Sequence, residues 1–119
     1  MPDGLTANHE ATPIDMLPGI VRRTLSEGAH TTLCELHMEA GSHVPAHTHP
    51  HEQTGYLSSG RFRFRLGDVW REMRAGDSWC VPGGVDHEVE VLEASVAIDV
   101  FSPVREEYRD PNFVPQSGH

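Results

Sequence analysis

Hydrophobic and polar residues alternate along most of the chain, in short segments that each have the length of a β-strand. Residues 61–66 read RFRFRL and residues 34–39 read CELHME, so apolar side chains recur at every second position in both. A period of two places these side chains on one face of a strand, and no window sustains the spacing of an amphipathic helix. The pattern therefore predicts strands.

Eight such segments are separated by Gly, Pro and Asp residues, which favour turns. The predicted strands cover residues 20–25, 31–39, 54–58, 61–66, 69–73, 77–81, 89–92 and 96–101. Short strands with turn signals every 8–12 residues are typical of a β-barrel or β-sandwich. We expect an all-β domain over residues 20–107, an extended N-terminal arm over residues 1–19 and a tail over residues 108–119.

The composition indicates one small domain with an acidic exterior. The 119 residues include 18 acidic side chains against nine arginines and no lysine, which gives a formal net charge of -9. A chain of this charge lacks the cationic surface that binds nucleic acid or anionic membranes, so neither partner is expected. The N-terminus lacks the pattern of a signal peptide, and Cys34 and Cys80 form no motif. We expect a cytoplasmic protein in which both thiols are reduced and buried.

The nine histidines are the unusual feature of the composition, and four of them lie within residues 43–51. His47 and His49 are two residues apart, so in an extended segment both side chains point to the same side. Gln53 continues this parity beyond a bend at Pro50, and His87 can add a third nitrogen from a separate strand. Imidazole nitrogens and an amide oxygen suit divalent transition metals, so these four residues are candidate ligands.

The spacing of these residues resembles the two motifs of the cupin superfamily. The motifs read Gly41-x5-His47-x-His49-x3-Gln53-x6-Gly60 and Gly76-x5-Pro82-x-Gly84-x2-His87. Gln53 stands where the family usually has Glu, and Val91 stands where an Asn often ends the second motif. The resemblance implies a single-domain cupin barrel, a double-stranded β-helix of the jelly-roll type.

The same resemblance implies one divalent metal ion, either Zn, Ni, Mn, Fe, Co or Cu, held by His47, His49, Gln53 and His87. Four neutral ligands would leave the full charge on the ion, which would make it a strong Lewis acid and anion binder. His43 and His51 share the parity of these ligands but lie beside bends, so they either support the site or are exposed. Glu52 should point away from the site, and His9, His30 and His37 should be solvated.

A second polar group is expected inside the barrel. In the segment VAIDVF, Asp99 shares a face with Ala97 and Phe101, and a buried carboxylate requires a partner. Arg105 and the metal are the candidate partners. Asp99 would be either half of a structural ion pair or a general base, with Arg105 as a clamp for a substrate carboxylate.

The stretch DVFSPVREEY, together with HTHPHEQ, is similar to the small bacterial cupins of pectin and alginate degradation. Those cupins convert unsaturated uronates, made by lyases, into the linear keto form. The similarity implies that Asp99 and Arg105 are catalytic and that Phe101 and Arg105 bind substrate.

Three functions remain open at this point. The first is an enzyme that polarises a small anionic substrate, such as a sugar acid, at a metal and moves a proton with Asp99. The second is a metal-dependent dioxygenase, although the ligand set lacks the carboxylate of the common Fe(II) triad. The third is a non-catalytic barrel that binds a metal or a small molecule.

The remaining features predict structural roles. Arg61, Arg63 and Arg65 should form ion pairs across strands with carboxylates such as Glu88 and Glu90. Tyr56, Trp70 and Trp79 are expected in the core or at a dimer interface. The outward face of residues 96–100 is apolar and suits a homodimer contact.

Overall fold

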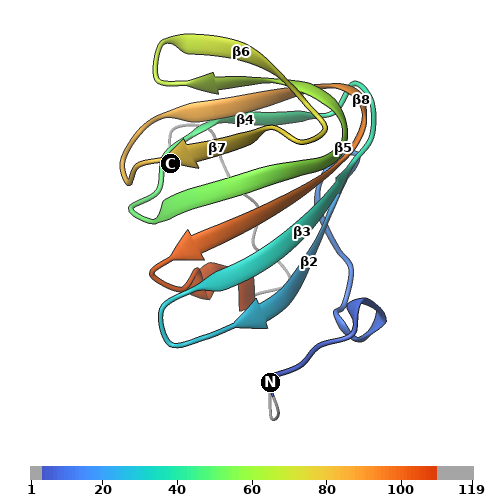
Figure 1. The fold of residues 1–119 in the computed structure, drawn as a ribbon, viewed down its shortest axis with the longest axis vertical. Helices are drawn as coiled ribbons and strands as arrows, with labels where there is room; N and C mark the ends of the chain where they lie inside the picture. The colour runs from blue at the N-terminus through green and yellow to red at the C-terminus, as the bar shows by residue number, and fades with distance from the viewer. Residues whose placement is uncertain (1–3, 110–119) are drawn as a thin grey trace.

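The computed structural model describes residues 4–109 and consists almost entirely of antiparallel strands that curve around a common interior (Figure 1). The strands are β1 (Ile14–Leu17), β2 (Ile20–Glu27), β3 (Thr32–Met38), β4 (His43–His47), β5 (Glu52–Leu66), β6 (Val69–Arg74), β7 (Ser78–Val81) and β8 (His87–Ser102). Two short 3₁₀ helices, η1 (Asn8–Glu10) and η2 (Glu106–Arg109), flank them. The predicted all-β class is confirmed. None of the helices in residues 4–109 has the length and apolar character needed to cross a membrane.

The strands form one sheet in the order β1-β2-β3-β8-β5-β6, with β4 paired to β8 and β7 paired to β5. The two longest strands, β5 and β8, pair along almost their whole length, from Glu52 opposite Ser102 to Leu66 opposite His87. These two strands bend together, so that the sheet curves back over its own inner face (Figure 1). The core and the candidate site both lie inside this curve.

Two predicted strand boundaries are wrong. Residues 54–58 and 61–66 belong to the single strand β5, and residues 89–92 and 96–101 belong to β8. The expected turns are register shifts in the β5–β8 ladder around Ser59 and Arg61. Gly60 has a φ of +93° at this point, and a Cβ atom there would lie 2.3 Å from the Ser95 hydroxyl oxygen. Glycine therefore lets the two strands bend without separating.

Two strands are additional to the predicted set. β4 contains Pro45, which sits in a register shift of the β4–β8 pair where no ladder donor is needed. β1 lies within the segment expected to be an extended arm and pairs with β2 as an edge strand. The expected tail begins inside η2, where Tyr108 is buried, and its residues 110–119 lie outside the described part of the chain.

The predicted alternation of inward and outward side chains is confirmed in residues 34–38 and 61–66. Cys34, Leu36 and Met38 on β3, and Phe62 and Phe64 on β5, all point into the core. Trp79 also belongs to this core, whereas Tyr56 is half exposed on the outer surface and Trp70 lies against the Arg63 guanidinium. Cys80 is exposed, contrary to expectation, because β7 alternates Trp79 and Val81 inward and Cys80 outward.

The predicted arginine pairs are present on the outer face. Arg63 pairs with Glu90 at 3.1 Å, and Arg65 pairs with Glu88 at 2.9 Å. Arg61 pairs instead with Glu72 and Glu93. These pairs connect β5 to β8 and β6 on the side of the sheet away from the core.

Candidate metal centre

Three histidine side chains meet inside the barrel. One ligand atom from each of His47, His49 and His87 lies within 4.8 Å of the other two, and all three residues are buried. The ring centroids of His47 and His87 are 4.2 Å apart, and those of His49 and His87 are 4.9 Å apart. The arrangement can hold a metal ion.

The fold brings these residues together from three places. His47 ends β4 and His87 begins β8, and the two are paired directly across these strands. His49 lies in the connection between β4 and β5, where its carbonyl oxygen accepts a hydrogen bond from the Gly84 amide at 2.9 Å. A Cβ atom on Gly83 would lie 2.3 Å from the Pro50 carbonyl oxygen. Glycine at this turn therefore allows the two ligand-bearing loops to touch.

Each histidine is oriented by a backbone carbonyl. His47 Nδ1 donates to the Pro45 oxygen at 2.9 Å, His49 Nδ1 to the His51 oxygen at 3.0 Å, and His87 Nδ1 to the Val85 oxygen at 2.9 Å. A carbonyl oxygen can only accept, so each neutral ring carries its proton on Nδ1 and leaves Nε2 with a free lone pair. Histidines that bind a metal through one ring nitrogen commonly donate the other N–H to a backbone carbonyl in the same way.

The electrostatics of the three rings suit metal binding. Burial lowers the pKa of His49 to about 4 and that of His87 to about 3, and it lowers the pKa of His47 as well. The rings are therefore neutral at neutral pH, as ligands must be. The buried Nε2 of His87 has no hydrogen-bond partner. A buried nitrogen without a partner is costly, and a metal ion would satisfy it.

Gln53 lies beside the histidines at the start of β5. Its Oε1 is 3.0 Å from His49 Nε2, and its Nε2 donates to Asp99 Oδ1 at 2.9 Å. Oε1 and the unprotonated Nε2 of His49 are both acceptors, so without an ion between them their lone pairs oppose each other. Two ligands about 2.1 Å from one ion, at right angles, are about 3.0 Å apart. The separation of Gln53 Oε1 and His49 Nε2 is therefore compatible with a shared metal ion.

Asp99 is buried on the inner face of β8, as its parity predicts. Its Oδ1 accepts hydrogen bonds from Gln53 Nε2 at 2.9 Å and from Trp79 Nε1 at 2.8 Å. Within residues 4–109 no hydrogen bond joins Asp99 to Arg105, whose Nε donates to Glu107 instead. Burial raises the pKa of Asp99, and these two donors and the more distant Arg105 charge oppose that shift.

Arg105 is held by its own set of contacts. Its backbone amide donates to Thr32 Oγ1 at 2.8 Å, and its Nε donates to Glu107 at 2.7 Å. The guanidinium carbon lies 4.7 Å from the centre of the Phe101 ring and 4.4 Å from that of Tyr108. Arg105, Phe101 and Asp99 all line the same lumen as His47, His87 and Gln53, as the sequence predicts.

The other histidines differ in their surroundings. His43 is half exposed and pairs with Glu88 on the outer face at 2.8 Å. His51 is buried beside His49, and its Nδ1 has no hydrogen-bond partner. The side chains of Glu52, His9, His30 and His37 are exposed, as expected.

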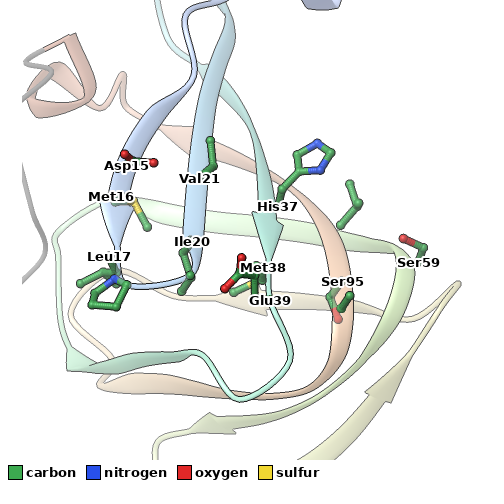
Figure 2. Close-up of a pocket in the computed structure, with 14 residues that line it drawn as sticks. Asp15, Met16, Leu17, Ile20, Val21, His37, Met38, Glu39, Ser59 and Ser95 are labelled. Carbon is green, nitrogen blue, oxygen red and sulfur yellow. The ribbon is translucent and has the colours of Figure 1, made fainter.

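The lumen beside the histidines is narrow. Its free volume is about 40 Å³, which is room for an ion and a water molecule but not for a whole sugar. A wider groove of about 910 Å³ lies between the β1–β2 hairpin, the end of β3 and the bends of β5 and β8, and none of the candidate ligands lines it (Figure 2). Only Met16 and Met38 line both spaces.

Sequence reasoning missed three residues of the site. Trp79 was assigned only to a core or an interface, although its inward parity on β7 placed it on the same side as Asp99. Gly55 makes room for both, because a Cβ atom there would lie 2.1 Å from the Trp79 ring and 2.4 Å from Asp99 Oδ1. Arg22 is buried on β2 with its guanidinium carbon 4.2 Å from the centre of the Tyr108 ring, so this ring contacts two cations, Arg22 and Arg105.

Comparison with known proteins agrees with this geometry. The family model described as "Cupin domain" matches residues 34–101. The pectin degradation protein KdgF of Dickeya dadantii is 29% identical over 102 residues, which cover 83% of this chain and 93% of that protein. The structure of KdgF from Halomonas sp. has 30% identity and a TM-score of 0.83, over 87% of this chain and 96% of that one. An RmlC-like cupin from Shewanella frigidimarina has 28% identity and a TM-score of 0.84, over 87% and 94%.

Proposed function

This chain belongs to the cupin family, and we propose that it is a metal-dependent enzyme that acts on a small anionic sugar acid, with unsaturated uronates as its substrate class. One observation carries the proposal. Two of the three clustered histidines, His47 and His87, line one lumen with a buried carboxylate and a buried arginine, so candidate groups for metal binding, proton transfer and anion binding lie together. The similarity to KdgF proteins, one of which is named for pectin degradation, supports the substrate class.

His47, His49 and His87 would hold the ion through Nε2, and Gln53 would hold it through Oε1. We propose one divalent transition metal, either Zn, Ni, Mn, Fe, Co or Cu, since imidazole binds all of these. When bound, such an ion supplies a Lewis acid that polarises a substrate oxygen. All four ligands are neutral, so they would not offset the positive charge of the ion. The carboxylate of Asp99, which lines the same lumen, is the group that would offset it.

Asp99 is the residue to which we assign proton transfer. Both of its hydrogen bonds end on Oδ1, so Oδ2 is the oxygen left to exchange a proton with the substrate. Converting an enol into a keto form requires one proton to leave an oxygen and one to arrive at a carbon. A fixed carboxylate in a water-poor lumen can carry out this exchange, since burial has already raised its pKa.

Arg105 is assigned to the substrate carboxylate. It is 3% exposed, and its guanidinium contacts the rings of both Phe101 and Tyr108, which restricts its orientation. A fixed guanidinium binds a carboxylate through two parallel hydrogen bonds. The lumen is too small for a whole sugar ring, so we expect only the reacting end of the substrate to enter, with Phe101 packing against it.

We also propose a cytoplasmic homodimer. Val96, Ile98 and Val100 form an apolar row on the outer face of β8 and remain partly exposed in one chain. A second copy would cover this row. Light scattering on a sizing column measures the mass directly, and a strictly monomeric mass would contradict the dimer.

The test uses protein purified without a histidine tag. Its metal content is measured, it is reloaded with each candidate metal, and 4,5-unsaturated uronates are screened for loss of enol absorbance. We expect turnover with at least one metal, and we expect Asp99→Asn to keep the metal and lose at least about 100-fold in kcat. The control is Glu52→Gln, which removes an exposed carboxylate from the same sheet and should leave kcat unchanged. Absence of turnover with every metal, or full activity of Asp99→Asn, would refute the proposal.

A further inference from the structure

We propose that Asp99, held by Trp79, is the positioning residue that points the carbonyl oxygen of Gln53 at the three histidines, and that its acceptor oxygen is the reason that position 53 carries the amide of glutamine rather than glutamate. The inference concerns the metal ligands assigned above but does not depend on the reaction. It follows from the direction of each hydrogen bond along a chain that runs from Trp79 through Asp99 and Gln53 to His49.

The chain starts at a group that can only donate. The indole Nε1 of Trp79 has a hydrogen and no acceptor capacity, and it lies 2.8 Å from Asp99 Oδ1. Oδ1 must therefore be an acceptor. Trp79 packs against both Phe62 and Phe64, with ring centroids at 5.3 Å and 5.5 Å, which restricts rotation of the indole.

Gly55 is what allows this contact. It lies between Trp79 and Asp99 on β5, paired with Trp79 on one side and with Asp99 on the other. A Cβ atom at this position would overlap the indole ring at 2.1 Å and the carboxylate at 2.4 Å. The three residues are therefore in contact because the strand between them has no side chain at that point.

The polarity of Asp99 then fixes the amide of Gln53. Since Oδ1 accepts, the group of Gln53 that lies 2.9 Å from it must be the NH2 group. The amide is planar, so its oxygen is turned to the opposite side, where it lies 3.0 Å from His49 Nε2. A glutamine amide could otherwise present either group to the histidines, and only the oxygen can bind a metal ion.

The same contact disfavours the glutamate that the family usually has at this position. An ionised glutamate would place a carboxylate oxygen about where the Gln53 nitrogen lies, against Asp99 Oδ1, and the donated hydrogen that now joins the two residues would be lost. Gln53 and Asp99 are 7% and 3% exposed, so water could not screen two like charges there. Bringing such charges together in a buried site is strongly unfavourable.

The test is a four-member cycle of metal-free proteins at pH 8: wild type, Gln53→Glu, Asp99→Asn and the double variant. We expect Gln53→Glu to lower the thermal unfolding midpoint by roughly 10 °C. Asp99→Asn should change it little, because an amide oxygen can accept both hydrogen bonds. The double variant should recover at least half of the loss, since it no longer holds two charges.

Thr54→Glu is the matched control, because it adds the same charge to the neighbouring, outward-facing position of β5 and should leave the midpoint within about 2 °C of wild type. A Gln53→Glu protein as stable as wild type would overturn the inference. So would a double variant no more stable than Gln53→Glu. If Gln53→Glu does not fold, the double variant must still fold, and its failure to do so would count against the inference.

A second measurement reads the orientation itself. The chain has only two glutamines, Gln53 and Gln116, so ¹⁵N-glutamine labelling gives two side-chain amide signals. We expect the Gln53 protons to exchange with solvent at least tenfold faster in Trp79→Phe, which loses the indole donor, while Gln116 serves as the internal reference. Unchanged exchange of Gln53 in Trp79→Phe would contradict the role of Trp79. Both experiments use metal-free protein, so they stand apart from the outcome of the uronate screen.

Discussion

Two polar networks occupy opposite faces of the same two strands, β5 and β8. On the inner face, Gln53 of β5 meets His87 and Asp99 of β8 in a buried lumen. On the outer face, Arg63 and Arg65 of β5 pair with acidic residues of β8 at the surface. Residues that are adjacent in sequence, such as His87 and Glu88, therefore lie in different environments: His87 is buried in the lumen, and Glu88 pairs with Arg65 on the outer face.

The difference lies in what can replace a lost partner. Outside, water and salt ions can solvate a charge whose partner is removed, so each pair contributes little. Inside, the donors around the candidate ligands have few acceptors: His47, His49 and His87 each have one backbone carbonyl, and Gln53 and Trp79 share a single carboxylate oxygen. The narrow lumen leaves little room for water to compensate, so a change at one residue should alter the whole network. The comparison predicts large effects inside and small effects outside.

The largest effect should follow removal of a candidate ligand. We expect His87→Ala to weaken metal binding by at least about 100-fold, measured by calorimetry with Zn²⁺ or Ni²⁺, because it deletes a buried nitrogen aimed at the other two histidines. The control is His43→Ala on the paired strand β4, whose side chain is half exposed and points outward to Glu88. His43→Ala should bind metal as wild type does. Equal affinity in the two variants would remove His87 from the ligand set.

A smaller effect should follow overpacking of the inner network. Gly55→Ala would force a methyl group against Trp79 and Asp99, and we expect it to lower the free energy of unfolding by about 3 kcal/mol. Gly28→Ala is the control, because its new methyl group would meet only the Thr31 hydroxyl oxygen, at an ordinary 3.6 Å. Urea unfolding measures both. A Gly55→Ala protein as stable as Gly28→Ala would mean that the lumen is more adaptable than these contacts indicate.

Substitutions in the outer network should lower the free energy of unfolding only slightly, and less for the more exposed side chains. Arg65 is the best protected of its arginines, with a side chain 16% exposed and bonds to Glu88, Asp86 and the Gly67 carbonyl. We expect Arg65→Gln to lower the free energy of unfolding by about 1 kcal/mol at low salt and by less in 1 M NaCl. Arg63→Gln, which removes a 45%-exposed side chain, should cost less still. A large decrease in the free energy of unfolding of Arg65→Gln that does not depend on salt would contradict the expected difference between the two faces.

The inner face was largely predictable because it depends on local spacing. The parity of β8 placed Asp99 and Phe101 inside, and the family-like spacing indicated which histidines to group. What could not be predicted is register over long distances. That Gly55 lies opposite both Trp79 and Asp99 is a property of the β5–β7 and β5–β8 pairing, and no local pattern encodes it. The hydrogen-bond partners of Asp99 were not predicted for this reason, since both donors, Gln53 and Trp79, lie on other strands.

The strand boundaries failed for a different physical reason. Gly and Pro usually mark turns, and this rule gave a break at Gly60 and no strand around Pro45. In the structure, Gly60 and Pro45 both sit at register shifts within paired strands, where the chain bends but continues. A small barrel must bend its strands to close, so it uses turn-forming residues inside strands.

The smallest effect should come from the two thiols, which lie on opposite sides of the sheet. Cys34 is fully buried, and burial raises its pKa to about 11, so about one in a thousand of its thiols is ionised at pH 8. Cys80 is exposed on the outward side of β7.

We expect iodoacetamide to modify one thiol per native chain, which peptide mapping should identify as Cys80. In urea it should modify both thiols. Cys80→Ser should abolish labelling of the native protein and leave the unfolding midpoint and metal content unchanged. Labelling of Cys34 at a comparable rate would show that the inner face opens to solvent, and the tight inner network inferred above could not then persist.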